Sequence, residues 1–389
     1  MNNMQTIGVN KWLLLATLLL ICFGIAVVYT ASTPHALQRG LSPEFYLKAH
    51  LWKVLAALVI MFVVSKVDYS VWMKGSRVVF IIGAVLTVAA IVAGGSVKGA
   101  NRWIWGIQPS EILKLGLISW ICAKLAVAGT EIKTLKCSLI QPAIPFGISA
   151  ILLALQPNFS MLLLFAGITL AVLFVAEARF KYIAISLAAC VPVGLIVLLI
   201  KSHTSKRLMA FFNPAENQNS AYQGEHALEA LGNGGFFGTG FGMGVQKLGY
   251  LPEAHKDVVY AVIGEEFGFV GTFAILLLFG MLFYQGFEIA RNSSSRFGKY
   301  MAVALTISLF LNFLVHVCVS TGLFPTTGQP LPFLSFGGTN LIFSALFIGI
   351  LLNISKPGTG TKIWEPYMKN GDRTDTRPRT DYETSRSGR

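Results

Sequence analysis

The chain has 389 residues, of which 54% are hydrophobic and 13% are charged, with a formal net charge of +13 and a mean hydropathy of +0.63. Ordinary soluble domains carry about 25% charged residues, so this much apolar surface does not fit into one water-soluble core. The composition excludes disordered, collagen-like, disulfide-stabilised and soluble-enzyme classes. Continuous apolar runs also exclude a membrane β-barrel, whose strands alternate in polarity over about 10 residues.

Uncharged runs divide the chain into candidate membrane spans. In chain order they cover residues 12–38, 78–97, 137–176, 182–200, 267–287 and 300–355. Each run reaches or approaches the roughly 20 residues that a helix needs to cross a bilayer. Two of the runs are too long for one helix, and they are interrupted by Gln156-Pro157-Asn158 and by the Gly- and Pro-rich segment 321–338. We expect two helices from each of these two runs.

Two weaker spans are expected at residues 50–66 and 110–128, where Lys and Glu side chains lie near the ends. The sequence thus predicts an all-α polytopic membrane protein with about ten transmembrane helices. Residues 1–355 are expected to form one membrane domain with a large extracytoplasmic loop at about 201–265, and residues 356–389 a disordered cytoplasmic tail. We interpret the first helix as a retained anchor and not as a cleaved signal peptide.

The distribution of Lys and Arg predicts the orientation of the spans. With an even number of spans both termini lie on one side, and twelve basic residues of the short connections share that side against six on the other. The positive-inside rule therefore predicts that both termini are cytoplasmic. This topology and attraction to anionic lipid account for the net charge, so we expect no nucleic-acid partner.

The expected outer loop contains a glycine-rich segment at residues 232–244, GNGGFFGTGFGMG. A nucleotide-binding loop would need a surrounding βαβ unit, which the predicted elements do not include. We therefore interpret the segment as irregular backbone whose residues Phe236, Phe237 and Phe241 dip into the membrane interface. A cradle for a lipid-linked pyrophosphate stays open as the alternative.

Other polar residues have simple structural interpretations beside functional ones. Glu265 and Glu266 are predicted to begin a span, where carboxylates favour the positive end of a helix, and a paired-carboxylate hydrolase is the alternative. Asn312 and His316 are four residues apart and are expected to form hydrogen bonds between helices. The six histidines show no zinc-binding spacing.

Four segments carry a resemblance to a known family. Residues 251–268, LPEAHKDVVYAVIGEEFG, resemble the signature of the SEDS family (shape, elongation, division and sporulation). Three other segments are similar to further motifs of this family: NRWI at 101–104 followed by QPSEILK at 108–114, QPN at 156–158, and GLFPTTGQPLPFLSFGG at 322–338. The resemblance covers roughly residues 10–355, with the motifs in the family's order. The first segment is more similar to division-type than to elongation-type members.

The resemblance implies a bacterial inner-membrane glycosyltransferase. Such an enzyme polymerises lipid II, an undecaprenyl-pyrophosphoryl disaccharide-peptide, into peptidoglycan strands at the outer face of the cytoplasmic membrane, with inversion at the sugar. The implied partners are a class B penicillin-binding transpeptidase and other membrane proteins of the division or elongation machinery. The family's proposed catalytic aspartate corresponds to Asp257.

The chemistry of glycan extension agrees with this implication. A base must take a proton from the acceptor hydroxyl, and the Asp257 carboxylate is suited to that role. The departing pyrophosphate needs positive charge, which Arg102, Lys114, Lys256 or a bound divalent cation could supply. No cofactor is certain and the metal ligands are unknown. The candidate substrate-binding residues are Arg102, Glu111, Lys114, Asn158, His255, Lys256 and Ser335.

Glu111 and Lys114 are three residues apart on one predicted helix face. They either form a structural ion pair or line the substrate cavity.

The chain departs from the family pattern at three places. Lys256 and Val258 replace the usual Thr and Phe on either side of Asp257, and Asn158 replaces the usual Asp. Thr339-Asn340 stands where Ser-Ser is common. The change at Asn158 removes or moves any charge role of that aspartate.

Two other functions stay open. A lipid II flippase also suits ten spans, although transporters place substrate residues near the bilayer midplane. A non-catalytic division scaffold would keep its full function after loss of Asp257.

Overall fold

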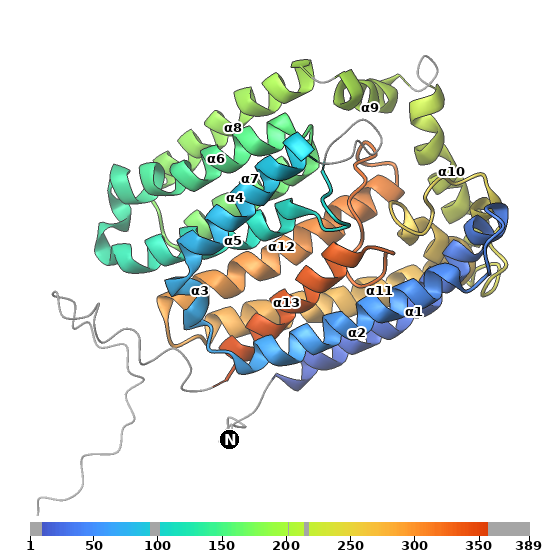
Figure 1. The fold of residues 1–389 in the computed structure, drawn as a ribbon, viewed down its shortest axis with the longest axis horizontal. Helices are drawn as coiled ribbons and strands as arrows, with labels where there is room; N and C mark the ends of the chain where they lie inside the picture. Colours follow the sequence, from blue (N-terminus) through green and yellow to red (C-terminus); the bar gives the residue numbers. More distant parts are fainter. Residues whose placement is uncertain (1–9, 94–101, 201, 214–217, 357–389) are drawn as a thin grey trace, which may run out of the picture.

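The computed structural model describes residues 10–93, 102–200, 202–213 and 218–356, and within these ranges the regular elements are helices (Figure 1). The predicted all-α class is confirmed. Two sequence predictions fall outside the described residues, namely the disordered tail beyond Lys356 and the end of the third span at 94–97. In chain order the helices are α1 (Lys11–Gln38), α2 (Phe45–Lys66), α3 (Ser70–Lys74), α4 (Ser76–Ala93), α5 (Pro109–Ala128), α6 (Gln141–Leu155), α7 (Phe159–Val175), α8 (Phe180–Ile200), α9 (Ser202–Phe212), α10 (Gln218–Gly234), α11 (Val259–Arg291), α12 (Arg296–Ser320) and α13 (Gly338–Ile354).

Most helices have the length or apolar composition of membrane spans. Six stretches are long and apolar enough to cross a membrane: α1, α2, α4, α11, α12 and the continuous unit Lys136–Leu155, in which a π-turn leads into α6. Shorter apolar helices are α7, residues Phe180–Cys190 of α8, and α13. Helix α5 packs among these elements although it contains Glu111, Lys114 and Lys124. The polytopic membrane class is confirmed, and the count of ten spans stays a prediction.

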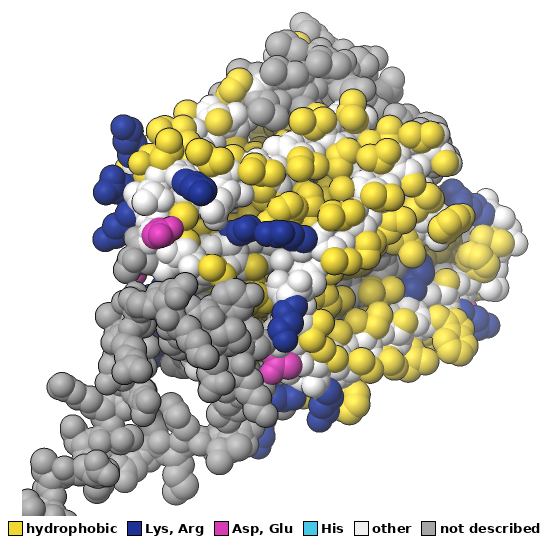
Figure 2. Space-filling view, turned by 60° about the vertical axis from the view of Figure 1, so that its left-hand side comes forward, with side chains coloured by type: hydrophobic (Ala, Val, Ile, Leu, Met, Phe, Trp, Pro, Cys, Tyr) yellow, Lys and Arg dark blue, Asp and Glu magenta, His cyan; other side chains and the backbone are white. Residues whose placement is uncertain are grey.

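The surface matches a protein that faces lipid. In Figure 2 hydrophobic side chains cover most of the face, and many Lys and Arg side chains lie along its left and right margins. Side chains of α2 such as Leu55 and Phe62, and of α4 such as Val85, are half or more exposed. Apolar residues in such positions are stable where hydrocarbon, not water, surrounds them.

The predicted interruptions of the long runs are confirmed. Helix α6 ends at Leu155 and α7 begins at Phe159, on either side of Gln156-Pro157-Asn158. Helix α12 ends at Ser320 and α13 begins at Gly338, on either side of the Pro-rich segment.

The span predicted at 267–287 corresponds to the second part of a longer, broken helix. Helix α11 begins at Val259 and contains a break at Gly268, whose φ of 65° and ψ of −160° are not helical. Apolarity alone marked only the second part of this helix, because the first part carries the two charged residues Glu265 and Glu266.

Small residues let the central helices approach closely. Helices α4 and α5 pack against each other, and a Cβ added at Gly83 or Gly116 would lie 2.6 Å or 2.5 Å from backbone of the facing helix. Close backbone approach through small residues is the usual way in which helices associate in membranes.

The up-and-down order of the helices gathers alternate connections at one end of the bundle. The connections α4–α5, α6–α7, α8–α11 and α12–α13 all contribute residues to one cavity there. In Figure 1 this end lies toward α9 and α10.

Candidate functional site

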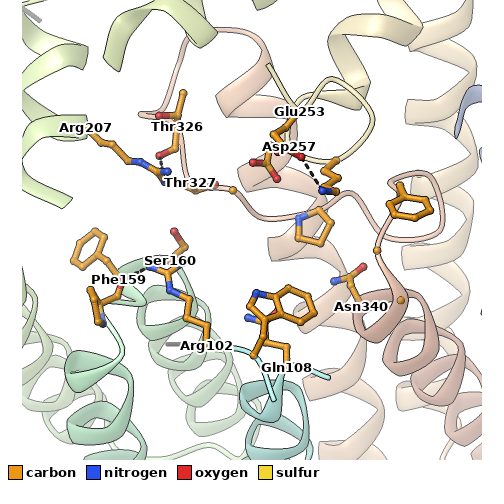
Figure 3. A pocket seen from close by; sticks show the side chains of 18 of the residues that line it. Arg102, Gln108, Phe159, Ser160, Arg207, Glu253, Asp257, Thr326, Thr327 and Asn340 are labelled. Carbon is orange, nitrogen blue, oxygen red and sulfur yellow. Dashed lines mark hydrogen bonds and ion pairs between the residues drawn. The ribbon is translucent and has the colours of Figure 1, made fainter. Parts of the chain in front are cut away.

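A cavity of about 470 Å³, lined by both charged and apolar side chains, lies where these connections meet. Figure 3 shows side chains from several connections converging on it. Its lining contains four cationic and two acidic residues: Lys53, Arg102, Arg207, Lys256, Glu253 and Asp257. The cavity therefore combines a surplus of positive charge with carboxylates.

Asp257 is held on a short turn just before α11. Its backbone N–H donates to the carbonyl oxygen of Glu253 (3.1 Å), and the carbonyl of neighbouring His255 accepts from Phe336 N–H (2.8 Å). These bonds join the turn to the Pro-rich segment before α13. A Cβ at Gly328, whose φ is 70°, would lie 3.6 Å from the Asp257 carboxylate, so the segment passes close beside that group.

Two arginines reach the cavity from different elements. Arg102 donates from Nε to the carbonyl oxygen of Gln156 (3.2 Å) and from a terminal nitrogen to that of Pro157. Arg207, on α9, donates to the carbonyl oxygen of Thr326 (3.3 Å). Burial, with Arg207 nearby, lowers the pKa of Arg102 to about 10. Burial also lowers the pKa of Arg207, while the Asp257 carboxylate opposes this shift.

The other two cations of the lining are the lysines Lys53 and Lys256. Lys256 forms an ion pair with Glu253 at 2.8 Å. The ammonium of Lys53 lies 4.0 Å from the centre of the Phe336 ring, and the aliphatic part of Lys53 runs along Gly338.

Three predicted substrate-binding residues lie behind the lining. His255 is buried against His35, Tyr46 and Phe336, and burial, with Lys256 nearby, lowers its pKa to about 3, so the ring is neutral. Ser335 accepts from Leu331 N–H and shapes the Pro-rich segment. Asn158 is buried at the start of α7.

Glu111 and Lys114 form an ion pair of 2.7 Å that is almost completely buried within α5. Lys114 also lies beside the ring of Phe347. Neither residue lines the cavity. The sequence left open a structural ion pair or a place in the lining of the cavity, and the structure shows the ion pair.

The interpretation of Glu265 and Glu266 as capping residues at a helix start is wrong. Both lie inside α11 and are buried, and their carboxylates bind residues 242–247 at the end of the glycine-rich segment and just after it. Glu265 accepts from the N–H groups of Val245 (2.8 Å) and Gln246 (3.1 Å), whereas Glu266 accepts from Gly242 N–H (3.1 Å) and from the ammonium of Lys247. These bonds hold both carboxylates, so the structure does not favour a paired-carboxylate hydrolase.

The glycine-rich segment also completes the broken helix. Thr239 and Gly240 donate to the carbonyls of Glu265 and Glu266, and the N–H groups of Phe269 and Val270 donate to carbonyls of the segment. A Cβ at Gly238 would lie 2.2 Å from the Glu266 carbonyl oxygen, which explains a glycine there. The N–H groups of Thr239, Gly240 and Gly242 are already bonded to oxygens of Glu265 and Glu266, so the segment does not favour a pyrophosphate cradle.

Sequence reasoning missed several lining residues, above all Lys53, Gln108, Arg207 and Asn340. Gln108 lies in the motif 108–114, and Asn340 belongs to the Thr339-Asn340 departure that follows the segment 322–338, so both had a signal in the sequence. Lys53 lies near the start of the span predicted at 50–66, and Arg207 follows the apolar run 182–200. No signal distinguished either of them from ordinary interfacial cations.

Fold and cavity together define a polytopic helical membrane protein with a polar, cation-rich site at one end. Residues 11–359 match the FtsW/RodA/SpoVE family model, described as cell cycle protein. The chain belongs to this family, and the predicted SEDS membership is confirmed.

Named relatives and solved structures agree. A protein of Trichlorobacter lovleyi, named "Probable peptidoglycan glycosyltransferase FtsW", is 35% identical over 88% of this chain and 92% of its own. One of the same name from Borreliella burgdorferi is 34% identical over 88% of this chain and 95% of its own. The fold is similar to a chain of a peptidoglycan synthase complex (TM-score 0.73, 20% identity, 89% and 97% of the two chains). It is also similar to RodA of Thermus thermophilus (TM-score 0.66, 21% identity, 91% and 98%).

The buried pair of Lys247 and Glu266 gives a testable prediction. Lys247→Met would leave a buried carboxylate without its cation, which typically costs about 3–5 kcal/mol. We expect a clear fall in the midpoint of thermal unfolding in detergent, and recovery of most of it in Lys247→Met/Glu266→Gln. The matched control is Lys48→Met, which removes an exposed pair with Glu44 and is expected to change stability by at most about 1 kcal/mol. Equal effects of the two lysine variants would contradict this role.

Proposed function

We propose that the protein is a peptidoglycan glycosyltransferase that polymerises lipid II in cell division, with Asp257 as the catalytic base. The observation that carries this proposal is the position of the Asp257 carboxylate in a cavity with four cationic side chains. Extending a glycan from a lipid-pyrophosphate donor needs a base for the acceptor hydroxyl and positive charge for the leaving group, and this cavity contains both.

The reaction is a single displacement. The acceptor hydroxyl oxygen forms a bond to the anomeric carbon of the donor, and the bond from that carbon to the pyrophosphate oxygen breaks. The proton of the hydroxyl passes to the Asp257 carboxylate, and the electron pair leaves with the pyrophosphate. Attack opposite the leaving group inverts the anomeric centre.

Cations of the cavity wall stabilise the charge that develops on the pyrophosphate. Arg102 and Arg207 are held by backbone carbonyls, so little reorganisation is needed at the moment of reaction. Within the described residues no three His, Cys, Asp or Glu side chains gather to hold a metal ion. A divalent cation at this site would therefore take ligands from Asp257 or Glu253 and from the substrate phosphates.

The proposal also covers the membrane orientation of the protein and its partner protein. The cavity opens at the outer face of the bacterial inner membrane, both termini are cytoplasmic, and a class B penicillin-binding transpeptidase crosslinks the emerging strands. The positive-inside count of the sequence supports the orientation. The fold shared with a chain of a peptidoglycan synthase complex is consistent with the transpeptidase partner.

The catalytic role of Asp257 is tested by Asp257→Asn. The substitution keeps size and polarity but removes the base, so polymerisation of lipid II by purified protein should fall by about 10²–10⁴. Protein level and thermal stability should stay near wild type. Glu44→Gln, which changes an exposed carboxylate outside the cavity, serves as control and should keep full activity. Long glycan strands made by Asp257→Asn at near wild-type rate would refute the base and favour a flippase or a scaffold.

The orientation is tested by cysteine labelling. Glu225→Cys, in a background without native cysteines, places a thiol on the exposed face of α10. We expect an impermeant thiol reagent to label it in intact spheroplasts. Labelling that requires lysis would reverse the topology.

A further inference from the structure

The four cations of the cavity are arranged as two pairs. All four line one cavity; Arg102 and Arg207 are held by backbone carbonyls, Lys256 lies beside Glu253 and Lys53 lies over Phe336. The charges of the two arginines act on each other, as do those of the two lysines. In the view of Figure 3, Arg102 and Arg207 lie to the left of the cavity, Asn340 lies to the right, and Asp257 lies between them. Like charges held close together repel each other, and an anion bound between the members of a pair would relieve this repulsion.

The arginine pair is the more rigid of the two. Its members are anchored on three backbone carbonyls of two connections, those of Gln156 and Pro157 for Arg102 and that of Thr326 for Arg207. Each guanidinium has five N–H donors, so these anchors leave donors for a phosphate, which arginine binds through two parallel hydrogen bonds. Neither arginine forms an ion pair among those of the described residues, although Arg207 lies near Asp257.

The positive charge of the lysine pair is partly neutralised by an ion pair. Lys256 is already paired with Glu253, and its side chain is 39% exposed. Lys53 rests on the Phe336 ring beside Gly338. Flexible ammonium groups that are partly neutralised hold an anion less tightly than two anchored guanidiniums.

Polymerisation from lipid-linked units requires two pyrophosphates at once, one on the donor and one on the acceptor. We propose that Arg102 and Arg207 bind the pyrophosphate of the donor. Lys53 and Lys256 bind the pyrophosphate of the acceptor. Asp257 lies between the two sites and accepts the proton of the acceptor hydroxyl. This assignment rests on the proposed function.

The direction of the assignment follows from where charge develops. Negative charge grows on the donor pyrophosphate as its bond to the sugar breaks, and preorganised donors stabilise such charge best. The acceptor pyrophosphate keeps its charge throughout the step. After transfer, the elongated chain must leave the acceptor position before the next cycle, which a weaker anion site favours.

The test uses two substrates that each fill one position. A lipid II derivative blocked at its acceptor hydroxyl acts only as donor, and a lipid II analogue with a non-cleavable carbon–phosphorus link at the anomeric centre acts only as acceptor. Together they give one tetrasaccharide product, so that kcat and a separate KM for each substrate can be measured with the full-length purified protein.

We expect Arg207→Gln to raise the KM of the donor by on the order of tenfold, the effect of losing one charge-assisted contact, with the KM of the acceptor nearly unchanged. Lys256→Gln should do the reverse. Arg207→Lys, which keeps the charge, should recover part of the donor affinity, and the midpoint of thermal unfolding should show that each variant is folded. Lys48→Gln, outside the cavity, should change neither KM.

Equal increases of both KM values in both variants would show a single shared anion site and overturn the assignment. Exchanged effects would overturn its direction. Failure of the wild-type protein to form any tetrasaccharide would instead refute the proposed glycosyl transfer, and the assignment with it.

Discussion

Backbone N–H and C=O groups between apolar helices must find partners inside the protein, because hydrocarbon offers none. This constraint governs where the chain is able to be irregular. At the break in α11, the glycine-rich segment supplies donors and acceptors to the groups that the helix leaves unpaired. The carboxylate of Glu266 binds the N–H of Gly242 in that segment, and the carboxylate of Glu265 binds that of Val245 just after it. The break is therefore stable although it lies within the helical bundle.

The same constraint explains why the site lies at one end of the bundle. Irregular connections gather there and satisfy one another, as when Arg102 binds the carbonyls at the α6–α7 break and Phe336 binds the carbonyl of His255. Several connections and helices contribute lining residues, and no single helix forms the cavity. A change in one connection is expected to affect several lining residues together.

The sequence was most informative where physical signals are local. Pro157 and the Pro-rich segment predicted the helix breaks correctly, because a proline removes a backbone donor and disfavours the helix before it. Proline alone was not sufficient as a signal, since Pro34 and Pro145 lie inside helices α1 and α6. Glu265 was misinterpreted, because its partners at 242–246 lie about twenty residues earlier in an irregular segment. Motif membership did not separate Lys114, which is buried with Glu111, from Arg102, which lines the cavity. Arg207 lines the cavity because α9 packs beside it, and the pattern of apolar residues does not predict how α9 packs.

The central claim, that lipid II reacts in this cavity, is tested most directly by photo-crosslinking. A benzophenone amino acid replaces Phe159 or Phe324, both in the lining, or Tyr284, an exposed position on α11 outside it. Radiolabelled lipid II should crosslink at Phe159 and Phe324, excess unlabelled lipid II should abolish the signal, and Tyr284 should give little. Equal labelling at Tyr284, or cavity labelling that excess lipid II does not displace, would contradict the account.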